Sequence, residues 1–371
     1  MQARLVTILG AALAACSSSR AVDPTPALAP PVTATPGEAG TADALAAAVA
    51  PAPPAYEVLA TGLREINSIA VTGRRVVLGD GDRVLEVPKA AGGTPAVVLA
   101  LGHHEGEITF DDHIGYSGGS HVAAWGEEAI AGRVVVRGKR PVVELLRVSR
   151  PKQPIASRVP AYGASSLVVV GDALFWQAHL LPGPGPLVRT DLKTGRSQTV
   201  IPLPMSWYTG PGQGWLYATD GRVVVQLATE VDGEISALYT SRIGGGDAEL
   251  WRVKGEIGAF AIAGGAVYAL VSGELVSGEL LPGEKDGVWR VPLDRTPPTK
   301  LPIDSATTVF ARGDLAYVVT YEGLVAVRGT AIGKVAPADI VGPQTAVATD
   351  ETHAYWVEDD ELRRVALPPA P

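Results

Sequence analysis

The chain has 371 residues, of which 46% are hydrophobic and 19% charged, and its net charge is −8. It therefore carries ample apolar material for a core, and its length suits either one large all-β unit or two smaller domains. The negative charge and the lack of any run of basic residues argue against nucleic acid as a partner, because nucleic-acid binding uses clustered Lys and Arg. The 43 glycines and 30 prolines are dispersed, as expected for turns between short strands.

Residues 1–15 have the organisation of a secretory signal peptide. Arg4 precedes an apolar run at 5–13, which is too short to cross a membrane as a helix. The run ends in the sequence Leu-Ala-Ala-Cys at positions 13–16, and Cys16 is the only cysteine of the chain. An ordinary signal peptide with a chance cysteine is the alternative interpretation.

The Leu-Ala-Ala-Cys sequence resembles the lipobox of bacterial lipoproteins. The resemblance implies cleavage before Cys16, a diacylglycerol group on its sulfur and an acyl chain on its new amine. Two or more acyl chains anchor a protein stably to a membrane. Ser17 stands where, in many Gram-negative lipoproteins, an aspartate would favour the inner membrane. We therefore expect a lipid-anchored envelope protein, at the outer membrane where the host has one, facing the periplasm or the cell surface.

Residues 16–54 are rich in Ala, Pro and Thr and poor in large apolar side chains. Such a composition does not bury enough surface to fold, and its prolines keep the chain extended. We interpret this segment as a disordered tether between the lipid and a globular domain at 55–371.

From Tyr56 onward the sequence consists of short strand-like runs separated by turn residues. One run, which we interpret as the middle strand of each unit, recurs seven times, at 76–80, 121–125, 173–177, 215–219, 266–270, 315–319 and 353–357. Short strands that repeat about every 40 to 50 residues indicate a β-propeller. The sequence therefore predicts an all-β propeller.

Seven units account for the repeat, at 65–101, 107–160, 164–203, 205–255, 257–303, 305–340 and 343–367 with 56–61. The last unit ends after three strands, so we expect the N-terminal strand at 56–61 to complete it and close the ring. The second and fourth units are irregular, with apparent insertions at 126–143 and 220–234. Counts of six or eight blades remain open for that reason.

Glycines at the predicted joints between inner and middle strands support this organisation. Gly73, Gly171, Gly264 and Gly313 each stand between two strand-like runs. We expect them to supply the positive φ that tight hairpins require.

The units combine a Tyr- or Trp-containing middle strand with a third strand of the type Leu-x-Arg-Val-Pro-Leu. The best examples are 354–357 with 362–367, and 267–268 with 288–293. They resemble the Tyr/Trp-containing propeller repeats of bacterial surface lipoproteins. The resemblance implies the fold and almost nothing about function. Because WD dipeptides are absent at the strand ends, a WD-type ring is not expected.

The densest polar cluster lies near the junction of the first two units, and its candidate metal ligands are His103, His104, Asp111 and His113. Imidazole and carboxylate groups suit zinc or another divalent cation, although this spacing matches no established ligand motif. A solvated connection that simply requires polar residues is the alternative.

Other motifs favour structural interpretations. The Gly-x-Ser-x-Gly sequence at 115–119 functions as a nucleophile elbow only between a strand and a helix, so a turn is expected here. Residues 79–82 resemble the start of a calcium loop without its later acidic ligands, and 358–361 form an acidic turn. We expect Trp176, Trp289 and Trp356 to pack between strands, with sugar stacking as the alternative at a rim.

These patterns favour a binding or protein-interaction module at the cell envelope rather than an enzyme. Its partners would be the membrane, through lipid on Cys16, and an envelope protein or polysaccharide. No cofactor is expected unless a divalent metal occupies the His103–His113 region. The alternative function is a metal-dependent hydrolase or lyase that uses that region.

Overall fold

The computed structural model describes residues 56–367 apart from 65, 102–120, 138–139, 162, 181–182, 202–215, 220–221, 230–234, 243–247, 255, 273, 277–278, 282–285 and 338–346. All of the described strands lie within Gly40–Pro371, which forms one unit. They make seven four-stranded antiparallel sheets and one short hairpin.

The first three sheets, which we call blades 1 to 3, each contain four consecutive strands. Blade 1 is β2 (Ile66–Val71), β3 (Arg75–Asp80), β4 (Arg83–Pro88) and β5 (Ala96–Ala100). Blade 2 is β6 (Val122–Trp125), β7 (Glu128–Arg137), β8 (Arg140–Arg147) and β9 (Pro154–Pro160). Blade 3 is β10 (Gly163–Val170), β11 (Ala173–Leu180), β12 (Gly183–Asp191) and β13 (Ser197–Ile201).

Blades 4 to 7 repeat the arrangement with two variations. Blade 4 is β14 (Leu216–Thr219), β15 (Arg222–Thr229), β16 (Ile235–Arg242) and β17 (Ala248–Lys254). Blade 5 is β18 (Glu256–Ala263), β19 (Ala266–Ser272), β22 (Gly287–Pro292) and β23 (Thr299–Lys300). Blade 6 is β24 (Ala306–Arg312), β25 (Leu315–Thr320), β26 (Gly323–Arg328) and β27 (Ala331–Pro337). Blade 7 is β28 (Val347–Thr349), β29 (His353–Glu358), β30 (Glu361–Ala366) and β1 (Glu57–Ala60).

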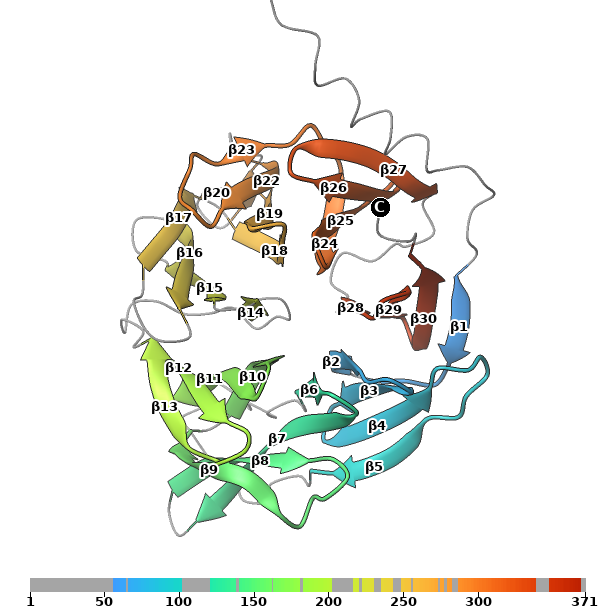
Figure 1. Ribbon diagram of the computed structural model, residues 1–371, viewed down its shortest axis with the longest axis vertical. Coiled ribbons are helices and arrows are strands. Elements are labelled where there is room, and N and C mark those ends of the chain that lie inside the picture. Colours follow the sequence, from blue (N-terminus) through green and yellow to red (C-terminus); the bar gives the residue numbers. More distant parts are fainter. Residues whose placement is uncertain are drawn as a thin grey trace, which may run out of the picture. The chain divides into compact units, whose positions relative to one another are not determined.

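The blades form a closed ring. The first strands of successive blades contact one another in the order β2, β6, β10, β14, β18, β24 and β28, and β28 contacts β2 again. Figure 1 shows these strands nearest the centre, with the later strands of each blade further out. The prediction of a propeller, and of seven units at nearly the predicted boundaries, is confirmed.

The ring is closed by the N-terminal strand, as the sequence predicts. Strand β1 pairs antiparallel with β30, and Glu57 lies opposite Arg364 in the ladder. The backbone NH of Leu63 also donates to the carbonyl of Asp360, at 3.1 Å. Pairing of the two ends of the domain in one sheet gives the last blade its fourth strand (Figure 1).

Apolar side chains gather between neighbouring blades. At six of the seven joints, one cluster draws buried residues from both flanking sheets; Trp176 belongs to the cluster between blades 2 and 3, and Trp356 to that between blades 6 and 7. Both indoles are fully buried, so packing is confirmed for these two tryptophans. Trp289 is only partly buried and lies against Trp251, with ring centroids 5.6 Å apart.

The repeat motif has a direct structural meaning. The aromatic residue of the middle strand and the arginine of the third strand are cross-strand partners in three blades: Phe175 with Arg189, Tyr268 with Arg290, and Tyr355 with Arg364. Directly opposed side chains on one face of a sheet pack against each other, so this pair fixes the register of the hairpin. The motif specifies blade packing, which explains why it carries little functional information.

The structure corrects the strand assignment in blades 2 and 4. The runs at 121–125 and 215–219, interpreted as middle strands, contain β6 and β14, which are the first strands of their blades. The apparent insertions at 126–143 and 220–234 fall mainly within β7, β8 and β15, the second and third strands. The error arises because inner and middle strands are both covered on two faces, so hydrophobic alternation does not separate them.

The turn glycines behave as predicted in three of four cases. Gly171, Gly264 and Gly313 have φ values of 57°, 52° and 58°. Gly73 is not among the positive-φ glycines; a Cβ there would overlap the carboxylate of Glu127 in blade 2. Glu127 is exposed and its carboxylate is the mobile end of its side chain. The tight hairpin predicted from Gly73 does not depend on a positive φ at this position.

Blade 5 contains a further hairpin that the sequence analysis does not predict. Strands β20 (Glu274–Val276) and β21 (Glu279–Leu281) pair with each other between β19 and β22. The available signal is a tandem repeat, because Val-Ser-Gly-Glu-Leu occurs at 271–275 and again at 276–280.

Candidate functional site

The predicted metal cluster of His103, His104, Asp111 and His113 lies outside the described residues, as does the serine motif at 115–119. Within the described part of the chain, no group of three or more His, Cys, Asp or Glu side chains is arranged to hold a metal ion. The metal site, and the hydrolase or lyase function that depends on it, stay predictions.

The two acidic motifs that lie among the described residues form hairpin turns, as expected. Asp80 ends β3, and its buried carboxylate pairs with Arg83 at the start of β4. The acidic turn at 358–361 joins β29 to β30, and Glu358 and Glu361 both bind the guanidinium of Arg363. These carboxylates therefore have structural partners.

A polar network surrounds Asp350 at the joint between blades 7 and 1. Its carboxylate accepts hydrogen bonds from the Nζ of Lys89 in blade 1 and from the hydroxyl of Tyr355, each at 2.7 Å. It also accepts hydrogen bonds from the backbone NH groups of Thr352 and His353, each at 2.8 Å. One carboxylate thus organises its own turn and attaches it to the neighbouring blade.

The network changes the acidity of its members. Burial alone would raise the pKa of Asp350, but the hydrogen bonds from Lys89, from the two backbone NH groups and from Tyr355 hold that pKa well below its usual range. Burial and the bond to Asp350 raise the pKa of Tyr355 well above its usual range. Burial, with the nearby charge of Arg364, lowers the pKa of His353. The joint therefore contains ionised Asp350 beside neutral Tyr355 and neutral His353 at neutral pH.

A second kind of contact recurs between blades. The carbonyl that directly follows the third strand accepts a hydrogen bond from the preceding blade at three joints. The pairs are Arg222 Nη1 to Leu293 at 3.3 Å, Tyr268 Oη to Gly329 at 3.1 Å, and Arg364 Nη1 to Lys89 at 2.5 Å. These bonds join blades 4 and 5, blades 5 and 6, and blades 7 and 1.

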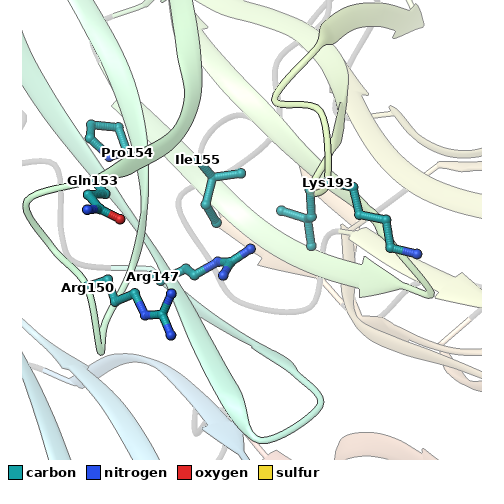
Figure 2. A pocket seen from close by; sticks show the side chains of 7 residues that line it. Arg147, Arg150, Gln153, Pro154, Ile155 and Lys193 are labelled. Atoms are coloured by element: carbon teal, nitrogen blue, oxygen red, sulfur yellow. The ribbon is translucent and has the colours of Figure 1, made fainter.

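The joint between blades 2 and 3 contains a cleft of about 210 Å³. Its lining residues are Arg147, Arg150, Gln153, Pro154, Ile155, Leu192 and Lys193. Figure 2 shows Arg147, Arg150 and Gln153 on the blade 2 side and Lys193 across the opening. Leu192 directly follows the third strand of blade 3, so the cleft occupies the position at which other joints make their side-chain bond to a carbonyl.

Two turns build the cleft. In blade 2, the NH of Arg150 donates to the carbonyl of Arg147 at 2.9 Å, and the NH of Gln153 donates to that of Arg150 at 3.1 Å. In blade 3, the carboxylate of Asp191 accepts hydrogen bonds from the backbone NH groups of Lys193 and Thr194, at 3.1 and 2.7 Å. The bonds from Thr194 lower the pKa of Asp191, so this turn is held by an ionised carboxylate. Both turns therefore have defined backbones.

The sequence analysis does not predict this cleft. The sequence has no basic run, and the three cations come from the end of β8, from the turn that follows it and from a turn in blade 3. The available signal is local, because Arg147, Arg150 and Lys152 fall within six residues at the connection between β8 and β9.

No family model and no curated protein matches this chain. Several solved structures are similar to it. The chain is similar to the extracellular domain of a B. thetaiotaomicron protein described as a one component system, with 10% identity and a TM-score of 0.51, over 84% of this chain and 40% of that one. It is also similar to the β-propeller domain of the trilobed protease from Pyrococcus furiosus, with 11% identity and a TM-score of 0.50, over 84% of this chain and 100% of that one.

The fold and these similarities define the class: the chain is a β-propeller. The P. furiosus propeller has an open velcro topology, whereas β1 pairs with β30 here. At these identities the similarities describe the fold and leave function to be argued from the residues.

Proposed function

We propose that this protein is a lipid-anchored β-propeller, exported to the bacterial cell envelope, that works as a binding module for other envelope components. The signal sequence at 1–15, the lipobox ending at Cys16 and the Pro-rich tether to residue 54 support export and anchoring. Among the described residues, no helix is long and apolar enough to span a membrane.

The observation that carries the proposal is the position of β1. This strand directly follows the predicted tether, and it is also the strand that completes blade 7. A pull on the tether is therefore resisted by the β1–β30 ladder and by the ion pair between Glu57 and Arg364. The arrangement suits a closed, rigid ring presented at a distance from a lipid surface.

The anchoring part is tested by expressing the full chain and its Cys16→Ser variant in a bacterium that processes lipoproteins, with radiolabelled palmitate. We expect the wild type to take up label and to sediment with the outer membrane, and the variant to lose both. Ser17→Asp should retain the label and move to the inner membrane, while Ser18→Ala is the matched control. An unlabelled wild-type chain would contradict the proposal.

The binding part is tested by crosslinking in intact cells followed by affinity purification of the anchored chain. We expect one or a few envelope components to be captured reproducibly with the wild type. Recovery of the chain alone, under conditions in which a known envelope complex is crosslinked, would contradict it.

A further inference from the structure

The cleft between blades 2 and 3 has a charge that sets it apart in an acidic protein. The chain carries a net charge of −8, yet three of the seven side chains that line the cleft are cationic and none is acidic. Such a local reversal of sign attracts an anionic group.

The nearby carboxylates already have partners, and one of them, Asp172, pairs with the cleft cation Lys193. Glu128 binds the hydroxyl of Ser149, Asp172 binds Lys193 at 2.5 Å, and Asp191 holds the turn that contains Lys193. Within the described part of the chain, neither Arg147 nor Arg150 has a carboxylate partner. Two guanidinium groups at one opening are therefore available to a ligand.

Arg147 is also held in a useful orientation. Its guanidinium lies over the ring of Trp125, with the central carbon 4.9 Å from the ring centroid. A stacked guanidinium keeps its edge NH groups free, and these bind a carboxylate in a two-pronged geometry. Arg150, on the exposed turn three residues later, lies beside it in Figure 2.

The remaining lining residues indicate what accompanies the anion. Pro154, which is exposed, and Ile155, which is partly exposed, supply apolar surface next to the two guanidinium groups, whereas Leu192 is buried. A ligand that combines one or two charges with apolar groups matches this surface, whereas a long polyanion would be repelled by the net negative charge of the rest of the chain. A short acidic segment of a protein satisfies both conditions.

We propose that the cleft between blades 2 and 3 is a docking site for an acidic peptide segment, whose carboxylate binds Arg147 and Arg150 while an adjacent apolar side chain packs on Pro154 and Ile155. The proposal rests on the binding-module function above, but it concerns the ring alone and does not depend on the lipid anchor. Lys193, on the blade 3 side, is paired with Asp172, whose hydrogen bond and charge raise the pKa of Lys193, so the anion is bound by Arg147 and Arg150.

The test uses fluorescence anisotropy of the full chain, as its soluble Cys16→Ser form, with a fluorescein-labelled peptide of alternating Glu and Leu. We expect saturable binding that weakens with added salt, and about tenfold or more weaker binding in Arg150→Ala, because hydrogen bonds to charged groups contribute strongly to affinity. The Gln/Leu form of the peptide should not bind. Arg196→Ala is the matched control, because Arg196 is exposed near the same blade 3 turn but does not line the cleft.

Equal binding by wild type and Arg150→Ala would overturn the proposal, and so would an equal loss in Arg196→Ala, which would indicate general attraction. Calorimetry with inorganic phosphate separates a peptide site from a simple anion site: phosphate binding without peptide binding would also overturn it. Arg150 is exposed, so its variant should fold normally, and circular dichroism verifies this. Binding in this assay is independent of membrane fractionation, so failure of the site and failure of the anchor are distinguishable.

Discussion

The guanidinium of Arg364 lies 2.5 Å from the carboxylate of Glu57, although the two residues are 307 positions apart in the sequence. The same guanidinium donates to the carbonyl of Lys89, also at 2.5 Å. One side chain therefore joins the N-terminal strand, the C-terminal hairpin and blade 1.

Replacing Arg364 tests this role in closure. We expect Arg364→Ala to lower the free energy of unfolding by about 1–2 kcal/mol, because a partly buried ion pair and a bond to a carbonyl are lost together. Arg75→Ala is the control, since it breaks the more exposed pair with Glu86 inside blade 1 and should cost about 0.5 kcal/mol or less. Urea unfolding measures both free-energy changes. Equal losses would mean that the Arg364–Glu57 pair contributes no more to stability than the exposed Arg75–Glu86 pair.

Replacing Asp350 tests the network between blades 7 and 1. We expect Asp350→Asn to destabilise the fold by about 2 kcal/mol at pH 7, because the bonds from Lys89 and Tyr355 lose a charged acceptor. The folded-state pKa of Asp350 is lowered, so its contribution is complete above the unfolded value of 3.8 and is lost as pH falls below it. Urea unfolding at pH 7 and pH 3 should show a smaller difference between variant and wild type at pH 3.

The lowered pKa of His353 predicts a second pH dependence of stability, at higher pH than that of Asp350. Its folded-state pKa is lowered, so as pH falls below 6.5 the unfolded chain takes up a proton before the folded chain does. The stability is therefore complete above pH 6.5 and declines below it. We expect the melting temperature of the wild type to fall more between pH 7.5 and pH 5.5 than that of His353→Gln. Parallel declines would show that His353 does not contribute.

The backbone conformation of the turn between β18 and β19 predicts that a side chain at Gly265 destabilises the fold. Gly265 has a φ of 73° and open space around its Cβ position, so the cost of a side chain there is purely conformational. We expect Gly265→Ala to reduce the free energy of unfolding by about 1 kcal/mol, and Gly265→Asn to reduce it less, because asparagine tolerates this region. Equal losses in thermal unfolding would point to an unseen steric contact instead.

Most of the fold could be predicted from the sequence because each blade leaves a recognisable local motif. The cross-strand pair of Tyr355 with Arg364, for example, recurs as Tyr268 with Arg290. Blades 2 and 4 were assigned wrongly at their first two strands, since Trp125 ends an inner strand that is as apolar as a middle one. The closing strand was predictable because a three-stranded last unit leaves an unpaired edge.

The cleft was not predictable in the same way. Arg147 ends strand β8 of blade 2 and Lys193 lies in a turn of blade 3, and only the docking of blade 2 on blade 3 brings them to one opening. Nor does the sequence reveal that Glu128 and Asp172 are already bound, which is what leaves the arginines available. Such a site depends on which charges are neutralised in three dimensions rather than on a motif.

The pairing of β1 with β30 also imposes an order on biosynthesis. Joining residues 307 positions apart carries a loop-closure cost of about 5 kcal/mol, whereas strand pairing within a blade closes much shorter loops and costs less. During synthesis, β1 has no partner strand until residues 361–366 have been made. Strand β1 is thus the first to be made and the last to be paired, and completion of the final hairpin supplies its partner.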